Sequence, residues 1–359
     1  MGQFYGSAVV GICGKSNKTE KDVIIMLIDT KTYEIVEKAM EGNGLNPEEI
    51  GYLYSLGTFS KDSFYVQWAG RELSMHASQG IAEIHAQIGL NGTVCSKNCQ
   101  FCSFAACNKV RQGVLEMPLE DILNYAKAYE EQGANLILML TTANFKFEKL
   151  LDITRAVRKV ISPEMPLLAN TGDFNLAQAK LLKEAGINGV YHAVRMGESV
   201  VTSIPVETRL ATIKAVQEAG LKLCTCVEPV GPEHTIEELV EKTMISINMH
   251  PVFSGVGGRI TVPGTKMENY GMLSSSRLAL FDAVYRLAVG LECPLNCSGH
   301  SSVAANAGAN IAWAEVGTNP RDLVEKTEKG GRGQNIEELR KLFERTEWEL
   351  RKGPSPYWM

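Results

Sequence analysis

Apolar residues follow two alternating periods along most of this chain. Short apolar runs typical of buried strands occupy residues 88–94, 135–140, 166–170, 189–194, 222–228, 255–262, 291–298 and 310–315. Between them lie longer segments with helical spacing, over 118–132, 147–160, 176–185, 206–219, 236–249, 275–290 and 302–307. Strands that alternate with helices of about 10–15 residues are typical of βαβ units and a parallel sheet. Eight such units predict an α/β fold, the (β/α)8 TIM barrel, with its functional site at the carboxyl ends of the strands.

The segments that flank this repeat have helical patterns. Residues 29–40 have helical spacing, Asn46 and Pro47 suit an N-cap and a first helical position, and 61–73 is ambiguous. We expect these helices to pack over the N-terminal end of the barrel. Residues 335–352 have the pattern of a charged amphipathic helix. The predicted organisation is an N-terminal helical extension over 1–84, a barrel over 85–330, and a C-terminal helix and tail over 331–359.

Composition and charge narrow the class of protein. The 359 residues are 45% hydrophobic and 21% charged, which is ordinary for a soluble globular protein. A net charge of −5 gives no reason to expect a nucleic-acid partner. No apolar run approaches the roughly 20 residues needed to span a bilayer, and the first residues lack the pattern of a signal peptide. We therefore expect a cytoplasmic protein with neither a nucleic-acid nor a membrane partner.

The cysteines point to metal chemistry. Nine cysteines in a long chain without an export signal do not suggest a disulfide framework. Three of them, Cys95, Cys99 and Cys102, lie in the run V-C-S-K-N-C-Q-F-C-S-F-A-A-C, directly after the first predicted strand. Thiolates select iron–sulfur clusters, zinc or copper. Because an iron–sulfur cubane usually takes four cysteines, three would leave one iron open to another ligand.

Two other interpretations of this run remain. Free cysteine is among the most buried residue types, but Ser96, Lys97 and Asn98 make the segment too polar for a core strand. Alternatively, Cys107 closes a structural zinc site as the fourth ligand. The spacing to Cys107 is loose and no second C-x2-C pair follows nearby, so we prefer the cluster.

The C-x3-C-x2-C run, with the aromatic Phe101 directly before its last cysteine, resembles the signature of the radical S-adenosylmethionine (SAM) superfamily. The order of the elements, the run A-G-L-K-L-C-T-C-V-E-P-V-G and a later A-G-A-N resemble its biotin synthase-like group. That group includes biotin synthase, the di-iron hydrogenase maturase and methylornithine synthase. The resemblance covers residues 85–330. It implies a 4Fe–4S cluster on the three cysteines, SAM at the open iron, and hydrogen abstraction by a deoxyadenosyl radical. It also implies a small-molecule or carrier-bound substrate and an electron donor such as flavodoxin or ferredoxin.

The same resemblance suggests SAM contacts at the ends of the second and third strands. Phe101 lies beside the cluster, and Thr142 and Asn144 follow the second strand, where relatives contact the SAM amino group. Asn170 follows the third strand. Thr and Asn are also favoured helix N-caps, and this alternative stays open.

Further cofactor contacts are expected after the fourth and fifth strands. Glu198 resembles the acidic residue that holds the SAM ribose hydroxyls in relatives. Arg195 suits the SAM carboxylate, since arginine binds carboxylates bidentately; an ion pair between the two residues is the alternative. Glu228 completes the predicted cofactor-binding set.

Four more cysteines lie on predicted strands. Cys224 and Cys226 share one face of the fifth strand, and Cys293 and Cys297 share one face of the seventh. In biotin synthase the position that matches Cys224 ligates a second cluster, so the four thiols suggest an auxiliary iron–sulfur cluster. The alternative is that they are inert residues filling barrel layers. Other cluster-ligand positions of biotin synthase carry apolar residues here, near Met139 and Ala169, and Leu295 or Asn296 stands where its ligating arginine would be. A biotin synthase proper is therefore doubtful.

Two residues are candidates for substrate binding. Arg259 is a charge within an apolar strand, which is costly unless the charge is paired, and we expect it to face a substrate carboxylate. His300 follows the seventh strand, where a proton relay or hydrogen-bond donor is useful.

We therefore expect a radical SAM enzyme of cofactor biosynthesis, with sulfur insertion of the biotin or lipoyl synthase kind as the first hypothesis. The alternatives are a hydrogenase-cofactor maturase or a carbon-skeleton rearrangement without an auxiliary cluster. A non-enzyme alternative is an iron–sulfur or zinc scaffold. Polar residues after nearly every strand argue against the scaffold, because a scaffold needs no lined cavity.

Overall fold

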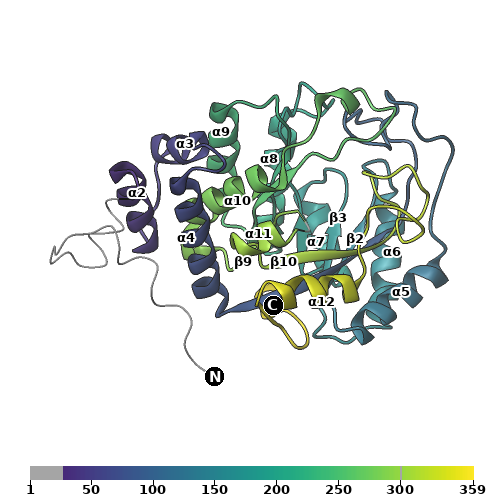
Figure 1. The fold of residues 1–359 in the computed structure, drawn as a ribbon. Helices are drawn as coiled ribbons and strands as arrows, with labels where there is room; N and C mark the ends of the chain where they lie inside the picture. Colours follow the sequence, from purple (N-terminus) through teal and green to yellow (C-terminus); the bar gives the residue numbers. More distant parts are fainter. Residues whose placement is uncertain (1–26, 300) are drawn as a thin grey trace, which may run out of the picture.

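Eight parallel strands form the centre of the protein (Figure 1). The computed structural model describes residues 27–299 and 301–359, so His300 lies outside the described residues. The strands are ordered β10-β1-β2-β3-β4-β5-β7-β9, and a parallel bridge between Cys297 and Ile311 joins the two ends. Their bounds are β1 (Ile81–Gly89), β2 (Leu136–Leu140), β3 (Leu167–Asn170), β4 (Gly189–Tyr191), β5 (Lys222–Cys224), β7 (Phe253–Ser254), β9 (Leu295–Asn296) and β10 (Ile311–Gly317). The predicted α/β barrel is confirmed.

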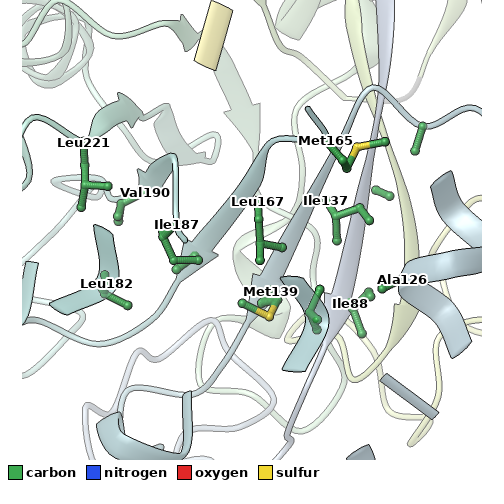
Figure 2. Packing of buried hydrophobic residues seen from close by; sticks show 14 of the residues in the cluster. Ile88, Ala126, Ile137, Met139, Met165, Leu167, Leu182, Ile187, Val190 and Leu221 are labelled. Atoms are coloured by element: carbon green, nitrogen blue, oxygen red, sulfur yellow. The ribbon is translucent and has the colours of Figure 1, made fainter. Parts of the chain in front are cut away.

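Helices cover the outside of this barrel. The outward-facing strand residues Ile88, Ile137 and Met139 pack with helix residues such as Ala126 and Leu182 in one apolar cluster (Figure 2). Strands buried on both faces explain the near-continuous apolar runs in the sequence. The helices are α5 (Leu119–Glu131), α6 (Phe147–Arg158), α7 (Leu176–Ala185), α8 (Val206–Glu218), α9 (Ile236–Ile247), α10 (Ser275–Val289) and α11 (Ser302–Asn306). All seven match predicted segments. None of the helices in the described ranges is both long and apolar enough to span a bilayer.

The first strand lies earlier than predicted. β1 ends at Gly89, whereas the prediction was 88–94, because Glu83, His85 and Gln87 face inward and interrupt the apolar run. The predicted fifth and sixth strands are each divided in two. The additional pieces, β6 (Val227–Val230) and β8 (Val256–Gly258), pair with each other in a separate small sheet. β1 therefore begins inside the segment assigned to the N-terminal extension, and Cys95 follows it after a short loop.

Three helices precede the barrel within the described residues from 27 onward. These are α2 (Thr30–Met40), α3 (Pro47–Ser55) and α4 (Lys61–Ser78), so the ambiguous segment is helical. Asn46 caps α3 through a capping box, with Pro47 at the first helical position, as predicted. The helices pack against α9 and α10 on the flank of the barrel (Figure 1). The expectation that they cover the N-terminal end of the barrel is wrong, because their buried apolar residues pack against the apolar residues of α9 and α10.

The C-terminal tail covers that end instead. After α12 (Ile336–Arg345), β11 (Glu349–Leu350) pairs with the start of β1, and a final turn η3 (Pro356–Trp358) follows. Trp358 is 1% exposed and belongs to the apolar cluster inside the barrel. Gly189 makes room for its ring, since a Cβ there would lie 2.8 Å from the indole. Two further short helical turns are η1 (Glu268–Tyr270) and η2 (Gly290–Glu292).

We expect Trp358→Ala to lower the free energy of unfolding by about 3–5 kcal/mol, because it removes a buried aromatic ring and leaves a cavity. Chemical denaturation of the full chain measures this. Phe59, which is 75% exposed, is the control, and Phe59→Ala should change stability by less than about 0.5 kcal/mol. Equal losses in the two variants would show that the tail does not seal the barrel.

Candidate functional site

The three cysteines lie in the long loop between β1 and α5, at the carboxyl end of the barrel. The backbone N–H of Cys95 donates to the carbonyl of Phe104 (2.7 Å), and the N–H of Ala106 donates back to Cys95 (2.9 Å). The N–H of Cys102 donates to the carbonyl of Cys99 (2.9 Å). The loop therefore folds back on itself and brings Cys95 beside the turn that carries the other two cysteines.

The thiols in this loop influence one another's pKa values. Burial raises the pKa of Cys99 to about 11, although Arg195 acts in the opposite direction. Burial and the nearby Cys99 raise the pKa of Cys102 to about 12, and Cys95 raises both pKa values further. Without a metal the thiols of Cys99 and Cys102 are protonated at neutral pH, so metal binding must displace their protons.

This donor set fits a cluster better than a single zinc ion. Over residues 27–299 and 301–359, no three His, Cys, Asp or Glu side chains lie close enough to bind one metal ion. A structural zinc gathers four ligands around one ion, whereas the cysteines of a cubane bind different iron atoms. Cys107 bonds to Asn98 instead: its N–H donates to the Asn98 side chain (2.9 Å), and its Sγ lies 3.7 Å from the Asn98 carbonyl. Cys95, Cys99 and Cys102 would therefore hold the cluster.

Asn108, which the sequence analysis missed, holds the loop together. Its Nδ2 donates to the carbonyls of Gln100 (3.1 Å) and Cys102 (2.8 Å), with a longer contact to Cys99 (3.4 Å). Its Oδ1 accepts from the backbone of Lys266 (3.1 Å). Asparagine commonly stabilises turns through such side-chain bonds, but the sequence does not indicate which carbonyls it will meet.

The predicted residues after β2 also support the loop. Asn144 accepts from the Ser96 hydroxyl (3.1 Å) and donates to the Val94 carbonyl (2.8 Å). Thr142 bonds to Asn91 through its N–H (2.9 Å) and its hydroxyl (2.8 Å). The N-cap alternative is wrong for both, because Lys146 occupies the N-cap of α6.

Other predicted contacts lie around the same opening. Asn170 ends β3 and Phe101 precedes the last cluster cysteine, and both are half-buried. Arg195 lies opposite Glu228, with its Nε 3.7 Å from the carboxylate. Burial lowers the pKa of Arg195, but the charge of Glu228 and the other acidic neighbours together outweigh it, and the net change is a rise. Glu198 is buried, and its side chain pairs with Arg209 (3.1 Å), not with the guanidinium of Arg195.

Glu315 and Arg321 form a second polar group at this end, also missed from the sequence. Glu315 is 5% exposed and accepts from Gln87 (3.0 Å), Asn319 (3.1 Å) and Arg321. Burial raises the pKa of Glu315 despite the opposing charge of Arg321. In the run I-A-W-A-E-V-G of β10, Glu315 lies two residues after Trp313 and four after Ile311, so it shares their inward face. This two-residue spacing was the sequence signal that could have identified Glu315.

Residues 92–242 match the sequence model of the Radical SAM superfamily, and this segment contains the cysteine loop, Arg195 and Glu228. The chain is a radical SAM enzyme. A biotin synthase from Desulforudis audaxviator is 29% identical over 265 residues, covering 70% of this chain and 78% of that protein. A biotin synthase from Clostridioides difficile is 25% identical over 297 residues, covering 78% and 90%. Membership of this family implies a 4Fe–4S cluster and SAM as cofactors.

Solved structures show the same fold. A methylornithine synthase matches with a TM-score of 0.71 and 18% identity, over 90% of this chain and 98% of that chain. The FeFe-hydrogenase maturase from Carboxydothermus hydrogenoformans matches with a TM-score of 0.72 and 17% identity, over 91% and 81%. Both proteins belong to the biotin synthase-like group that the sequence of this chain resembles. The individual SAM contacts in this radical SAM enzyme stay predictions.

The four barrel cysteines divide into two pairs. The thiols of Cys224 and Cys293 donate to backbone carbonyls, those of Val190 (3.4 Å) and Leu295 (3.3 Å). Cys226 and Cys297 lie one residue pair further along the strands and face each other, since the side chain of Cys297, together with burial, raises the pKa of the Cys226 thiol.

The inner faces of β2 and β3 carry no cysteine. Met139 and Ala169, predicted there, pack outward against the helices. The inward residues are Leu138, Leu140 and Leu168. The prediction placed apolar residues near Met139 and Ala169, and these neighbours are the apolar residues on the inner face.

Arg259 has an anionic partner within the protein. It is 3% exposed, and its guanidinium forms an ion pair with both carboxylate oxygens of Glu233 and donates to the carbonyl of Gly271 (3.0 Å). Glu233 already neutralises this charge, so the burial of Arg259 does not require the substrate carboxylate that we expected.

We expect Asn108→Ala to weaken cluster retention about 10–100-fold, the usual cost of losing a group that orients metal ligands. Iron and sulfide content after anaerobic reconstitution and a chelator challenge measures this. Asn335→Ala, which removes the N-cap of the remote α12, is the matched control and should keep its cluster. Equal retention by both variants would contradict the role given to Asn108.

Proposed function

We propose that this enzyme cleaves SAM reductively and directs the resulting deoxyadenosyl radical at a small substrate inside the barrel. The observation that supports this best is the hydrogen-bonded loop of Cys95, Cys99 and Cys102 at the carboxyl end of the barrel, which the segment after Arg195 contacts through Val201 and Ser203. A 4Fe–4S cluster, when bound, supplies the electron that breaks the sulfonium bond. A cytoplasmic location and an electron donor such as flavodoxin or ferredoxin belong to the same proposal.

The protein's residues would orient SAM and protect the site. Arg195 is suited to the SAM carboxylate, because Glu228 holds its guanidinium in place and leaves further N–H groups to donate. Thr142 and Asn144 would help to position the amino group of SAM, because their hydrogen bonds to Asn91 and Val94 hold the segment before Cys95 in place. The apolar inward residues Leu138, Leu140 and Leu168 would exclude water from the path of a reactive radical.

For the finer reaction, the barrel cysteines favour a rearrangement or maturation without an auxiliary cluster. Cys224 and Cys293 use their thiols on backbone carbonyls, which leaves Cys226 and Cys297 as one facing pair. A cubane usually needs more ligands than two. Sulfur insertion is the second candidate, supported by the biotin synthases among the relatives.

We expect the variant with Cys95, Cys99 and Cys102 all changed to Ala to lose deoxyadenosine formation completely. The assay is anaerobic reconstitution followed by dithionite and SAM, with deoxyadenosine measured by chromatography. Cys107→Ala is the matched control from the same loop and should retain activity. Loss of activity in Cys107→Ala, together with bound zinc in the wild type, would refute the proposal in favour of a zinc scaffold.

The same triple variant tests the finer reaction. We expect it to contain no iron above background after reconstitution, because the remaining cysteines do not form a cluster site. Residual iron and sulfide that disappear when Cys226 and Cys297 are also changed to Ala would instead support sulfur insertion.

A further inference from the structure

A network of ionisable side chains lies next to the predicted SAM contacts Arg195 and Glu198. We call Asp173, His192, Glu198 and Arg209 the charge network. Arg209 donates through Nε to Glu198 (3.1 Å) and through Nη1 to Asp173 (3.1 Å), and His192 Nε2 lies 3.1 Å from the same Asp173 oxygen. Arg209 and Glu198 are each 5% exposed. The network joins the segments after β3 and β4 to α8.

The carboxyl group of Asp173 is ionised at neutral pH. Burial raises the pKa of Asp173, but His192 and Arg209 outweigh it and lower the value to about 2. A buried ion pair is weak support for stability, since well-packed apolar residues often replace one without loss. The network is better explained as a means of holding these side chains in one geometry. Arg209 has defined partners in Asp173 and Glu198, and a displaced partner would leave a buried charge unpaired.

The element held in this geometry is the loop of residues 192–204, which we call the β4–α8 loop. The carboxylate of Glu198 accepts from the N–H of Arg195 (3.2 Å) and from the hydroxyl of Thr202 (2.6 Å). Glu198 thereby spans the loop from one side to the other. Both of its oxygens are occupied by this loop and by Arg209.

The β4–α8 loop in turn supports the cysteine loop. The N–H of Gln100 donates to the carbonyl of Val201 (2.8 Å), and the N–H of Ser203 donates to the carbonyl of Lys97 (2.9 Å). Lys97 and Gln100 bracket Cys99 in the sequence. A shift of Glu198 would therefore move both Arg195 and the backbone around Cys99.

We propose that Arg209, with Asp173 behind it, is a positioning residue that anchors Glu198 and so fixes Arg195 and the Cys99 segment for SAM. This inference rests on the proposed function, because it takes SAM as the ligand of Arg195. It also gives Glu198 a task beyond the predicted ribose contact, since its oxygens already bind the loop and Arg209. Loss of such an orienting partner typically costs about 10–100-fold in affinity.

The test uses two conservative variants and a matched control. Asp173→Asn keeps the shape but removes the charge opposite Arg209. Arg209→Lys keeps the charge but cannot donate to both carboxylates in the planar geometry of a guanidinium. Arg158→Lys is the control, because Arg158 is a half-buried arginine that binds the carbonyls of Met165 (2.6 Å) and Gly186 (2.8 Å) at the opposite end of the barrel.

The first measurement needs no cofactor. In cluster-free protein, hydrogen exchange at the Gln100 and Ser203 amides should accelerate in Asp173→Asn and Arg209→Lys relative to amides of β2. Arg158→Lys should leave the ratio unchanged, even if it lowers global stability. An unchanged ratio in Asp173→Asn would overturn the inference, also in the case that Arg209→Lys does not fold.

The second measurement is SAM affinity at equal iron content. Titration of SAM against the paramagnetic resonance spectrum of the reduced cluster gives the dissociation constant. We expect a value about 10–100-fold higher in Asp173→Asn and Arg209→Lys, and wild-type affinity in Arg158→Lys. Wild-type affinity in Asp173→Asn, or equal weakening in Arg158→Lys, would overturn the inference. Absence of SAM binding to the wild type would refute the proposed function itself, while the exchange experiment would still test the anchoring of the loop.

Discussion

A long loop with three cysteines must hold its shape before any metal binds, and hydrogen bonds from neighbouring strand ends provide that constraint. Asn144 after β2 holds the start of the loop, and the β4–α8 loop holds its middle at Lys97 and Gln100. The N–H of Ser103 donates to the carbonyl of Pro320 after β10 (3.0 Å). These supports come from strands far apart in sequence and meet only because the barrel closes. The register of the parallel strands therefore determines the geometry of the cysteines.

The two ends of the barrel are built for different purposes. At the N-terminal end, Glu83 pairs with Arg351 and with His85, and Trp358 closes the interior. Burial lowers the pKa of His85, so the ring is neutral at physiological pH. At the carboxyl end the side chains are polar and only partly covered, as Arg195 and Glu228 are. A sealed end and a polar open end restrict chemistry to the side where the cysteine loop lies.

The periodicity of apolar residues gave the architecture but not all of its boundaries. Helices such as α7 match the prediction to the residue, because their apolar faces pack on the barrel and their caps are local. β1 was misplaced because its inward residues are polar, and a polar barrel interior weakens the signal of a buried strand. The cysteine loop was found from spacing alone, since its three cysteines lie within eight residues of sequence. The N-cap alternative for Thr142 and Asn144 failed because their partners lie about 50 residues earlier in the chain.

By itself, the sequence determined the kind of fold, the metal-binding motif and the family to which it belongs, because each depends on residue types at short, fixed spacing. Only the tertiary structure decided which side chains fix that motif in space. Arg209 meets Asp173 across 36 residues, and Gln87 meets Glu315 across 228. Such pairs depend on strand register and barrel closure, which place residues together regardless of their separation. The contacts of Asn108, Arg209 and Glu315 follow from that closure and from no local pattern.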